Sequence, residues 1–189
     1  MKYLITTTFI VLMAVGSASA QNMNIGVKGG LNSYTVENYN TDFDSKIGFH
    51  LGLMSHFHMG DQFGLQPELV YSMQGAKSGN TELLLDYINV PVLFQYMFDN
   101  GFRLHVGPQI GFLLNAEVDN NGSTLDLKND FKPVDVALSF GASYVNPASG
   151  FGIDARYNLG ITDITENSNF ETTNRGIQIG VFYLFGHRN

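Results

Sequence analysis

Cysteine and tryptophan are both absent from this 189-residue chain, and charged residues make up only 14% of it. Without cysteine the chain can form no disulfide scaffold, no thiol nucleophile and no Cys-ligated zinc or iron–sulfur site. The charged fraction is well below the roughly 25% of an ordinary soluble domain. After the N-terminal segment no run of 18 uninterrupted apolar residues occurs, so we expect no membrane-spanning helix there.

The charge balance is acidic, with 17 Asp and Glu against 10 Lys and Arg and a formal net charge of −7. A nucleic-acid-binding protein needs a basic face to meet phosphate, so the composition argues against nucleic-acid partners.

The N-terminus has the anatomy of a cleaved export signal. Lys2 provides a short basic region, Leu4–Val15 is mostly apolar, and Ala18 and Ala20 place small residues at the positions that a signal peptidase reads. We therefore expect residues 1–20 to be a signal peptide and residues 21–189 to be the exported domain. A buried N-terminal helix and an uncleaved anchor are the alternatives.

After this segment, apolar residues recur at every second position in eight stretches. A two-residue period predicts strands with one apolar face, and most stretches have about the 9–11 residues of a tilted strand that crosses a bilayer. The eight stretches are Ile25–Leu31, Ile47–Met59, Phe63–Met73, Ile88–Phe98, Phe102–Leu114, Val134–Tyr144, Phe151–Ile161 and Ile177–Phe185.

The two faces of these stretches differ sharply in polarity. The apolar phase carries no charged residue, whereas the opposite phase carries three basic and three acidic side chains, together with several amides and histidines. A neutral, mixed-sign set suits a closed polar interior, because an unpaired buried charge is costly. The predicted polar network of the lumen consists of Lys28, Glu68, Arg103, His105, Asp135, Asp154 and Arg156.

Short and long connections alternate along the chain. The short ones are Gly60-Asp61, Asp99–Gly101 and Asn146–Gly150, and the long, acidic ones are Thr35–Ser45, Gly75–Glu82, Glu117–Lys132 and Thr162–Asn174. This alternation is typical of an outer-membrane barrel with short periplasmic turns and longer external loops. The fold class expected is all-β, an eight-stranded antiparallel up-and-down transmembrane β-barrel, with both termini on the periplasmic side.

A soluble lipocalin-like barrel that carries a small apolar ligand would have the same strand count with inside and outside inverted. The polar phase is dominated by Gly, Asn, Gln and Ser rather than by the Lys and Glu of a water-facing surface, which favours the membrane barrel. Aromatic residues also gather beside the short turns and predict an interfacial girdle. Its members are Phe57, Phe63, Tyr96, Phe98, Phe102, Tyr144, Phe151, Tyr183 and Phe185.

Three prolines, Pro67, Pro91 and Pro108, lie inside predicted strands of a barrel that has no free edge. Proline cannot donate to a strand ladder, so we expect β-bulges or local ladder breaks at these positions.

Few residues indicate chemistry. His56 and His58 could supply two metal ligands, but a site needs more, and a polar pair is the simpler interpretation. Ser139, His105 and Asp135 would form the triad of a lipid-modifying enzyme only if the fold brought them together. Asp119–Ser123 lacks the ligand pattern of a calcium loop. We therefore predict no enzyme activity, no cofactor and no metal.

The order and spacing of several strand motifs resemble the PorT-type outer-membrane β-barrel family of Bacteroidota. The motifs are Gly26-Val-Lys-Gly-Gly-Leu-Asn32, Leu65-Gln-Pro-Glu-Leu-Val-Tyr-Ser72, Tyr87-Ile-Asn-Val-Pro-Val-Leu93, Val106-Gly-Pro-Gln-Ile-Gly111, Phe151-Gly-Ile-Asp-Ala-Arg-Tyr157 and Arg175-Gly-Ile-Gln-Ile-Gly-Val181. The resemblance implies an eight-stranded barrel that tolerates strand prolines, and it implies no catalytic site. The family's namesake takes part in protein secretion.

The function expected is that of a small integral outer-membrane protein of a Gram-negative cell envelope, with a structural or interactive role. An eight-stranded barrel is just wide enough for side chains to fill, so we expect no wide pore. We expect contacts with outer-membrane lipid and lipopolysaccharide, to whose phosphates Lys132 and Arg175 lie suitably placed, and with proteins through the external loops or the periplasmic turns.

Overall fold

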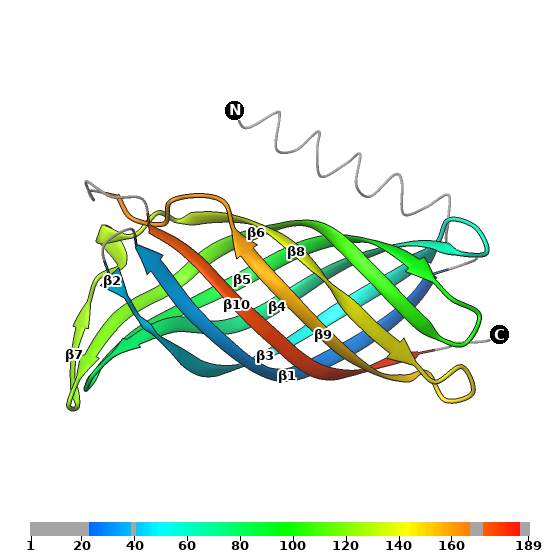
Figure 1. Cartoon of the computed structure of the whole chain (residues 1–189), viewed down its shortest axis with the longest axis horizontal. Helices are drawn as coiled ribbons and strands as arrows, with labels where there is room; N and C mark the ends of the chain where they lie inside the picture. The colour runs from blue at the N-terminus through cyan, green and yellow to red at the C-terminus, as the bar shows by residue number, and fades with distance from the viewer. Residues whose placement is uncertain (1–22, 39–40, 167–171, 186–189) are drawn as a thin grey trace.

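The computed structural model describes residues 23–38, 41–166 and 172–185, and almost all of them lie in β-strands (Figure 1). The predicted signal peptide, residues 1–20, lies outside the described residues. Within the described ranges, no helix is long and apolar enough to cross a membrane.

Eight long antiparallel strands form a closed barrel. They are β1 (Met23–Asn38), β3 (Asp44–His58), β4 (Phe63–Ser78), β5 (Thr81–Met97), β6 (Phe102–Asn120), β8 (Val134–Val145), β9 (Phe151–Gly160) and β10 (Thr172–Phe185). Each strand pairs with its neighbour in the chain, and β10 pairs with β1 to close the sheet. Closure leaves no free edge along the barrel wall, which is what a hydrocarbon environment demands of a sheet.

Two short strands and one helical turn decorate one end of the barrel. β2 (Thr41–Asp42) pairs with the end of β1, β7 (Ser123–Asp126) pairs with the end of β6, and η2 (Lys128–Asp130) is a single 3₁₀ turn. At the other end β1 begins, β10 ends, and three short turns join β3 to β4, β5 to β6 and β8 to β9 (Figure 1). We call these the decorated end and the short-turn end.

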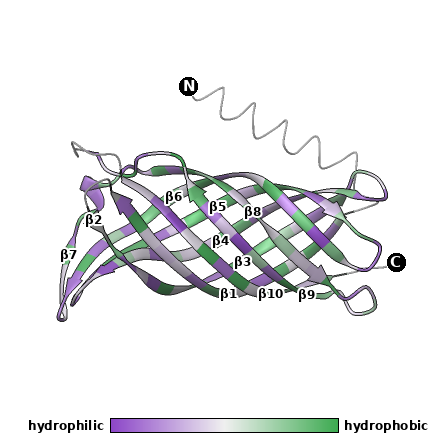
Figure 2. Cartoon of the chain, viewed as in Figure 1, coloured by the Kyte–Doolittle hydropathy of each residue, from purple (hydrophilic) through white to green (hydrophobic). Residues whose placement is uncertain are grey.

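The barrel wall presents its apolar side chains outward. Hydrophobic and hydrophilic residues alternate along the strands in Figure 2, and the outward set includes Leu51, Phe94, Ile153 and Ile179, each more than half exposed. The opposite phase faces inward and is buried. The lipocalin-like alternative requires the inverse arrangement, which the structure contradicts.

The three prolines interrupt the ladders without shifting the register. Pro67 still pairs with Val92 on β5, but the pairing of β4 with β3 is missing beside it. Pro91 and Pro108 likewise each interrupt the ladder on one side and keep the other. The reason is geometric: an antiparallel residue directs its N–H to one neighbouring strand, so losing that donor breaks one ladder. The expected local breaks are therefore present, while the two register shifts lie elsewhere, between Ser45 and His50 and between Asp86 and Tyr87.

At the decorated end the strands are longer than predicted. Gly75–Glu82 is not a long loop, because β4 and β5 continue through it and pair up to Ser78 and Thr81 across a two-residue turn. Most of Glu117–Lys132 is also ordered structure, in which β6 turns into β7 at Asn121 and Gly122 with φ of 52° and 88°. Asn-Gly is the typical pair for such a hairpin turn. Strands β4 to β7 thus project beyond the barrel (Figure 1).

The seam between β1 and β10 generates a testable prediction. Gly30 pairs with Gly180, and a Cβ at Gly30 would lie 2.2 Å from the Ile179 carbonyl oxygen and 2.4 Å from the Gly180 Cα. We predict that Gly30→Ala lowers the free energy of unfolding by about 1–3 kcal/mol, because backbone atoms must move to admit the methyl group.

Gly29→Ala is the matched control, since its Cβ would lie 3.4 Å from its nearest neighbours on the outward side. Urea unfolding in detergent, followed by far-ultraviolet circular dichroism because tryptophan is absent, measures both variants. Equal stability of the two variants would contradict the close approach at this seam.

Candidate functional site

The centre of the lumen holds a neutral cluster of four ionic side chains. Lys28 Nζ lies 3.2 Å from both Glu68 Oε2 and Asp154 Oδ1. Arg156 donates two hydrogen bonds to Glu68, of 2.8 and 2.9 Å, and one from Nε to Asp154 Oδ1, of 3.0 Å. These bonds tie three strands together across the lumen: β1 through Lys28, β4 through Glu68, and β9 through both Asp154 and Arg156. Two cations and two carboxylates offset one another, so none of the four buried charges is unpaired.

The other three members of the predicted network are also buried, but they lie at the edge of this cluster or away from it. His105 Nε2 is 3.6 Å from Asp154 Oδ2, at the edge of the cluster. Asp135 lies toward the decorated end, where it accepts a hydrogen bond of 2.9 Å from Thr162 Oγ1. Arg103 lies toward the short-turn end, and among the described residues no carboxylate is within ion-pair distance of it. Four predicted residues therefore meet, one borders them, and two do not.

A layer of amides and hydroxyls adjoins the ionic cluster on its decorated side. Asn32 Nδ2 donates to Ser72 Oγ at 2.9 Å, and Asn32 Oδ1 lies 2.6 Å from His50 Nδ1. On the other side of β1, Asn158 Nδ2 on β9 donates to the Tyr34 hydroxyl at 2.6 Å. These side chains come from strands far apart in the sequence. Their hydrogen bonds, which we call the amide lattice, link these strands through the lumen and fill it.

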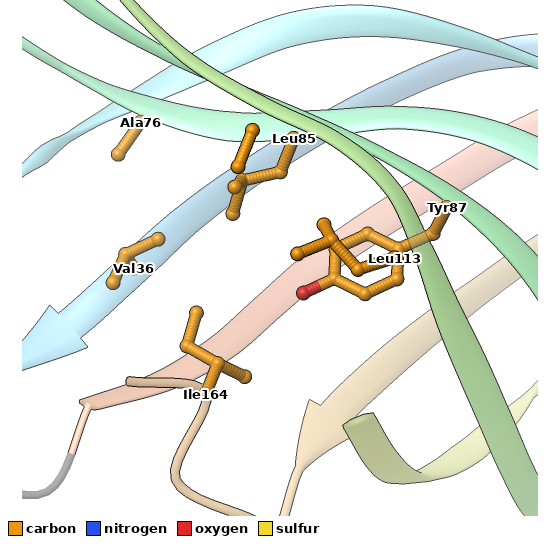
Figure 3. Packing of buried hydrophobic residues seen from close by; sticks show 7 residues of the cluster. Val36, Ala76, Leu85, Tyr87, Leu113 and Ile164 are labelled. Carbon is orange, nitrogen blue, oxygen red and sulfur yellow. The ribbon is translucent and has the colours of Figure 1, made fainter. Parts of the chain in front are cut away.

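Buried apolar clusters lie inside the barrel on both sides of the ionic cluster. Met54, Val145, Phe182 and Leu184 pack together on the short-turn side. On the decorated side, the apolar plug consists of Val36, Ala76, Leu85, Tyr87, Leu113, Ala116 and Ile164, and all of these except Ala116 are labelled in Figure 3. Ile164 follows β9 and is fully buried, so the chain around Ile164 folds inward over the strands.

Asp163 holds this part of the chain in place. It forms a 2.7 Å ion pair with Lys132, and its Oδ1 accepts hydrogen bonds from Thr165 Oγ1 and from the backbone N–H groups of Thr165 and Thr172. Partial burial would raise the pKa of the Asp163 carboxyl, but these donors outweigh burial and hold its pKa well below the usual range. The carboxylate is therefore ionised at physiological pH and fixes Ile164 in the plug.

The predicted girdle residues lie on the outer wall near the short-turn end. Their rings form two chains of contacts, Phe63–Tyr96–Phe98–Phe102 and Phe151–Tyr183–Phe185, with centroids 4.6–5.6 Å apart. Tyr144 is also exposed, and Phe57 is half-buried. Aromatic rings in this position suit the boundary between hydrocarbon and headgroups.

The candidate chemical sites do not assemble. His56 and His58 lie two residues apart on β3 and share the inward face, with their rings edge to face at 4.5 Å; His56 is buried, and His58 is exposed at the short-turn end. Within the described part of the chain, no group of three or more His, Asp and Glu side chains could hold a metal ion. Ser139 and Asp135 lie four residues apart on β8, about 13 Å, and Ser139 instead bonds to Asn158 at 2.6 Å. Asp119 accepts a 2.8 Å hydrogen bond from Gly122 N–H within the hairpin turn.

The cations expected to meet lipid phosphates already have carboxylate partners. Lys132 pairs with Asp163 at 2.7 Å, and Arg175 Nη1 lies 2.5 Å from Glu37 Oε2. These ion pairs reduce what either side chain can offer to an external anion.

Sequence reasoning missed the apolar plug. Its members on β4 and β5 fall partly in a segment, Gly75–Glu82, that was expected to be a loop, and Leu83-Leu84-Leu85 breaks the two-residue period because apolar residues occupy both phases. That run of leucines could have indicated the plug, because a strand with apolar surroundings on both faces is apolar at every position.

A closed eight-stranded barrel with an apolar wall, an aromatic girdle and a filled lumen defines a small membrane-spanning barrel protein. The family model for the outer membrane protein beta-barrel domain matches residues 19–166. The chain therefore belongs to this family and is an outer-membrane β-barrel protein.

Solved structures of bacterial surface barrels share the fold. Neisserial surface protein A aligns with a TM-score of 0.61 at 17% identity, covering 84% of this chain and 96% of that one. Ail, the attachment invasion locus protein of Yersinia pestis, aligns with a TM-score of 0.56 at 16% identity, covering 87% and 99%. Ail in complex with the heparin analogue sucrose octasulfate gives 0.53 at 16% identity over the same shares. At these identities the likeness concerns the fold alone. A comparison with curated proteins finds no match.

The ionic cluster generates a prediction about stability. Glu68→Ala leaves Lys28 and Arg156 with a single carboxylate between them, and we expect it to lower the free energy of unfolding by about 3–5 kcal/mol. Adding Lys28→Met restores neutrality around the remaining Arg156–Asp154 pair, so the double variant should recover most of the loss. Urea unfolding of wild type, both single variants and the double variant gives the coupling energy. A double variant as unstable as the sum of the singles would rule out charge balance as the cause.

The Asp163 contacts generate a second prediction. Replacing Asp163 by Asn removes the ion pair and weakens the acceptor, so the Thr165 and Thr172 amides should exchange with deuterium about fivefold to tenfold faster, as expected for a loss of about 1 kcal/mol. Because the pKa of Asp163 is depressed in the folded protein, its contribution is complete above the unfolded value near 3.9 and is lost only as the pH falls further. Wild-type protection should hold from about pH 7 to about pH 4, after correction for intrinsic exchange; a loss already at pH 6 would contradict this reasoning.

Proposed function

We propose that this protein is an outer-membrane anchor that displays a protruding β-sheet for contact with a protein partner. The observation that carries the proposal is the continuation of β4, β5 and β6 beyond the barrel, with β7 added at the side of the sheet. In the described part of the chain, β7 pairs with β6 alone, so its other edge is open. An open edge offers unpaired N–H and C=O groups to an extended segment of another chain.

The sheet is rigid enough to act as a preformed template. The apolar plug supports it from inside the barrel mouth, since Ala76, Leu85 and Ala116 of the projecting strands belong to that cluster. The tip of β6 pairs with β5 up to Thr81–Asn120 and with β7 down to Glu117–Asp126. Preorganisation of this kind lowers the cost of ordering a binding surface.

The contents of the lumen favour neither transport nor catalysis. The ionic cluster, the amide lattice and the two apolar clusters follow one another along the lumen, which leaves the centre filled by side chains. Ser139, His105 and Asp135 each have other neighbours, as described above.

The PorT-type resemblance makes this proposal more specific. The quoted motifs supply the lumen: Lys28 and Asn32 come from the first, Glu68 and Ser72 from the second, and Asp154 and Arg156 from the fifth. We infer a protein of Bacteroidota, exported through cleavage after Ala20, with a partner that belongs to a secretion machine. Contact with lipopolysaccharide is a further element of the proposal.

The heparin analogue seen with Ail is a polyanion. On the protruding sheet of this protein, the half-buried Glu117 and Asp119 and the exposed Asp126 would repel such a ligand.

The test uses the geometry of β7. Asn120 and Ser123 close a two-residue turn and form a hydrogen-bonded pair, so the next residue, Thr124, directs its N–H to the open edge. A photo-crosslinking residue at Leu125, which is 62% exposed, should yield a discrete protein adduct in living cells. Thr124→Pro should reduce this adduct at least tenfold, because it removes the edge donor, while Thr124→Val retains the N–H and the adduct.

A crosslinking residue at Ile153, on the lipid-facing wall, is the positional control. The same adduct from Ile153, or equal adduct in the Pro and Val variants, would contradict edge pairing as the mode of contact.

A further inference from the structure

Within the part of the chain that the structure describes, Arg103 is a buried cation without a counter-ion. The residue is only 4% exposed, and among the described residues its Nη1 has no hydrogen-bond partner and no carboxylate forms an ion pair with it. Arginine stays protonated in proteins, so it cannot relieve this situation by losing its charge. A buried and unpaired charge is costly, which indicates that a ligand supplies the missing anion.

Arg103 lines a polar cavity at the short-turn end of the lumen. The cavity has a volume of about 160 Å³ and is also lined by His58, Asp61, Asp99 and Gly101. Asp61 lies in the turn between β3 and β4, and Asp99 lies in the turn between β5 and β6, so both carboxylates are exposed while Arg103 is deep. Drug-sized ligands occupy about 300–1,000 Å³, and only a small molecule fits here.

The distribution of charge narrows the class of ligand. A simple anion would be attracted by Arg103 but repelled by the two carboxylates at the mouth of the cavity. A simple cation would be attracted by the carboxylates but would leave Arg103 without a counter-charge. A molecule with an anionic group at one end and an ammonium group at the other satisfies both.

The geometry points to a binding site for a small zwitterion at the short-turn mouth of the barrel. The anionic group of the ligand pairs with the Arg103 guanidinium, and its ammonium group is held by Asp61 and Asp99. Both a free amino acid and the phosphoethanolamine headgroup of a lipid have this chemistry. The site lies at the opposite end of the molecule from the protruding sheet, so its test is independent of the test of the proposed function.

Calorimetric titration of the full barrel in a non-ionic maltoside detergent tests the site. The zwitterionic probes are alanine and glycerophosphoethanolamine, and acetate and ethylamine carry the single charges. We expect saturable binding of at least one zwitterion, at least tenfold tighter than acetate or ethylamine. Tighter binding of alanine identifies an amino-acid type of ligand, and tighter binding of glycerophosphoethanolamine identifies a lipid headgroup.

Two variants separate the roles of the charges. Arg103→Gln should weaken binding of the zwitterion at least tenfold. The double variant Asp61→Asn, Asp99→Asn should weaken the zwitterion and strengthen acetate, because the repulsion of the anion is gone; both positions are exposed turn residues, so this variant tests the site even where Arg103→Gln fails to fold. Asp44→Asn, at the decorated end, is the matched control and should change nothing. Absence of saturable zwitterion binding, equal affinity for acetate, or unchanged selectivity in the double variant would overturn the proposal.

Discussion

The backbone hydrogen bond is the constraint on which the structure depends. A strand in hydrocarbon has no water to satisfy its N–H and C=O groups, so the sheet must close. Here the closing step is the pairing of β10 with β1, at a seam where Gly30 faces Gly180. A missing backbone hydrogen bond has only a local effect on the sheet: Pro67, Pro91 and Pro108 each interrupt one ladder, and the register is the same before and after each interruption.

Closure with eight strands then determines what the interior can be. The lumen is narrow enough for side chains to reach across it, as Lys28 reaches both Glu68 and Asp154. Charges placed there must balance, because water is excluded and unpaired ions are costly. The order along the axis, from an apolar cluster through ions and amides to the apolar plug, places side chains along the lumen.

The two ends of the molecule are where the proposed contacts lie. The decorated end extends as a sheet in which, as far as the described ranges go, β7 has an open edge, and Ile164 and Asp163 stabilise the base of this sheet. The short-turn end has a small cavity in which Arg103 lies deep and two carboxylates lie shallow. In the contacts that we propose, the decorated end offers main-chain groups to a polypeptide, and the short-turn end offers separated charges to a small molecule.

The two-residue period by itself determined the strands, their number and their orientation, because lipid and lumen impose opposite polarity on alternate residues such as Ile153 and Asp154. The period could not locate the strand ends, since the alternation fades at Leu83-Leu84-Leu85, where the environment on the two faces no longer differs. Only the tertiary structure decided which inward charges meet. Asp154 and Arg156 join Glu68 across the barrel, whereas Arg103 on β6 does not, because the stagger between strands, which no single strand encodes, sets the height of each side chain in the lumen.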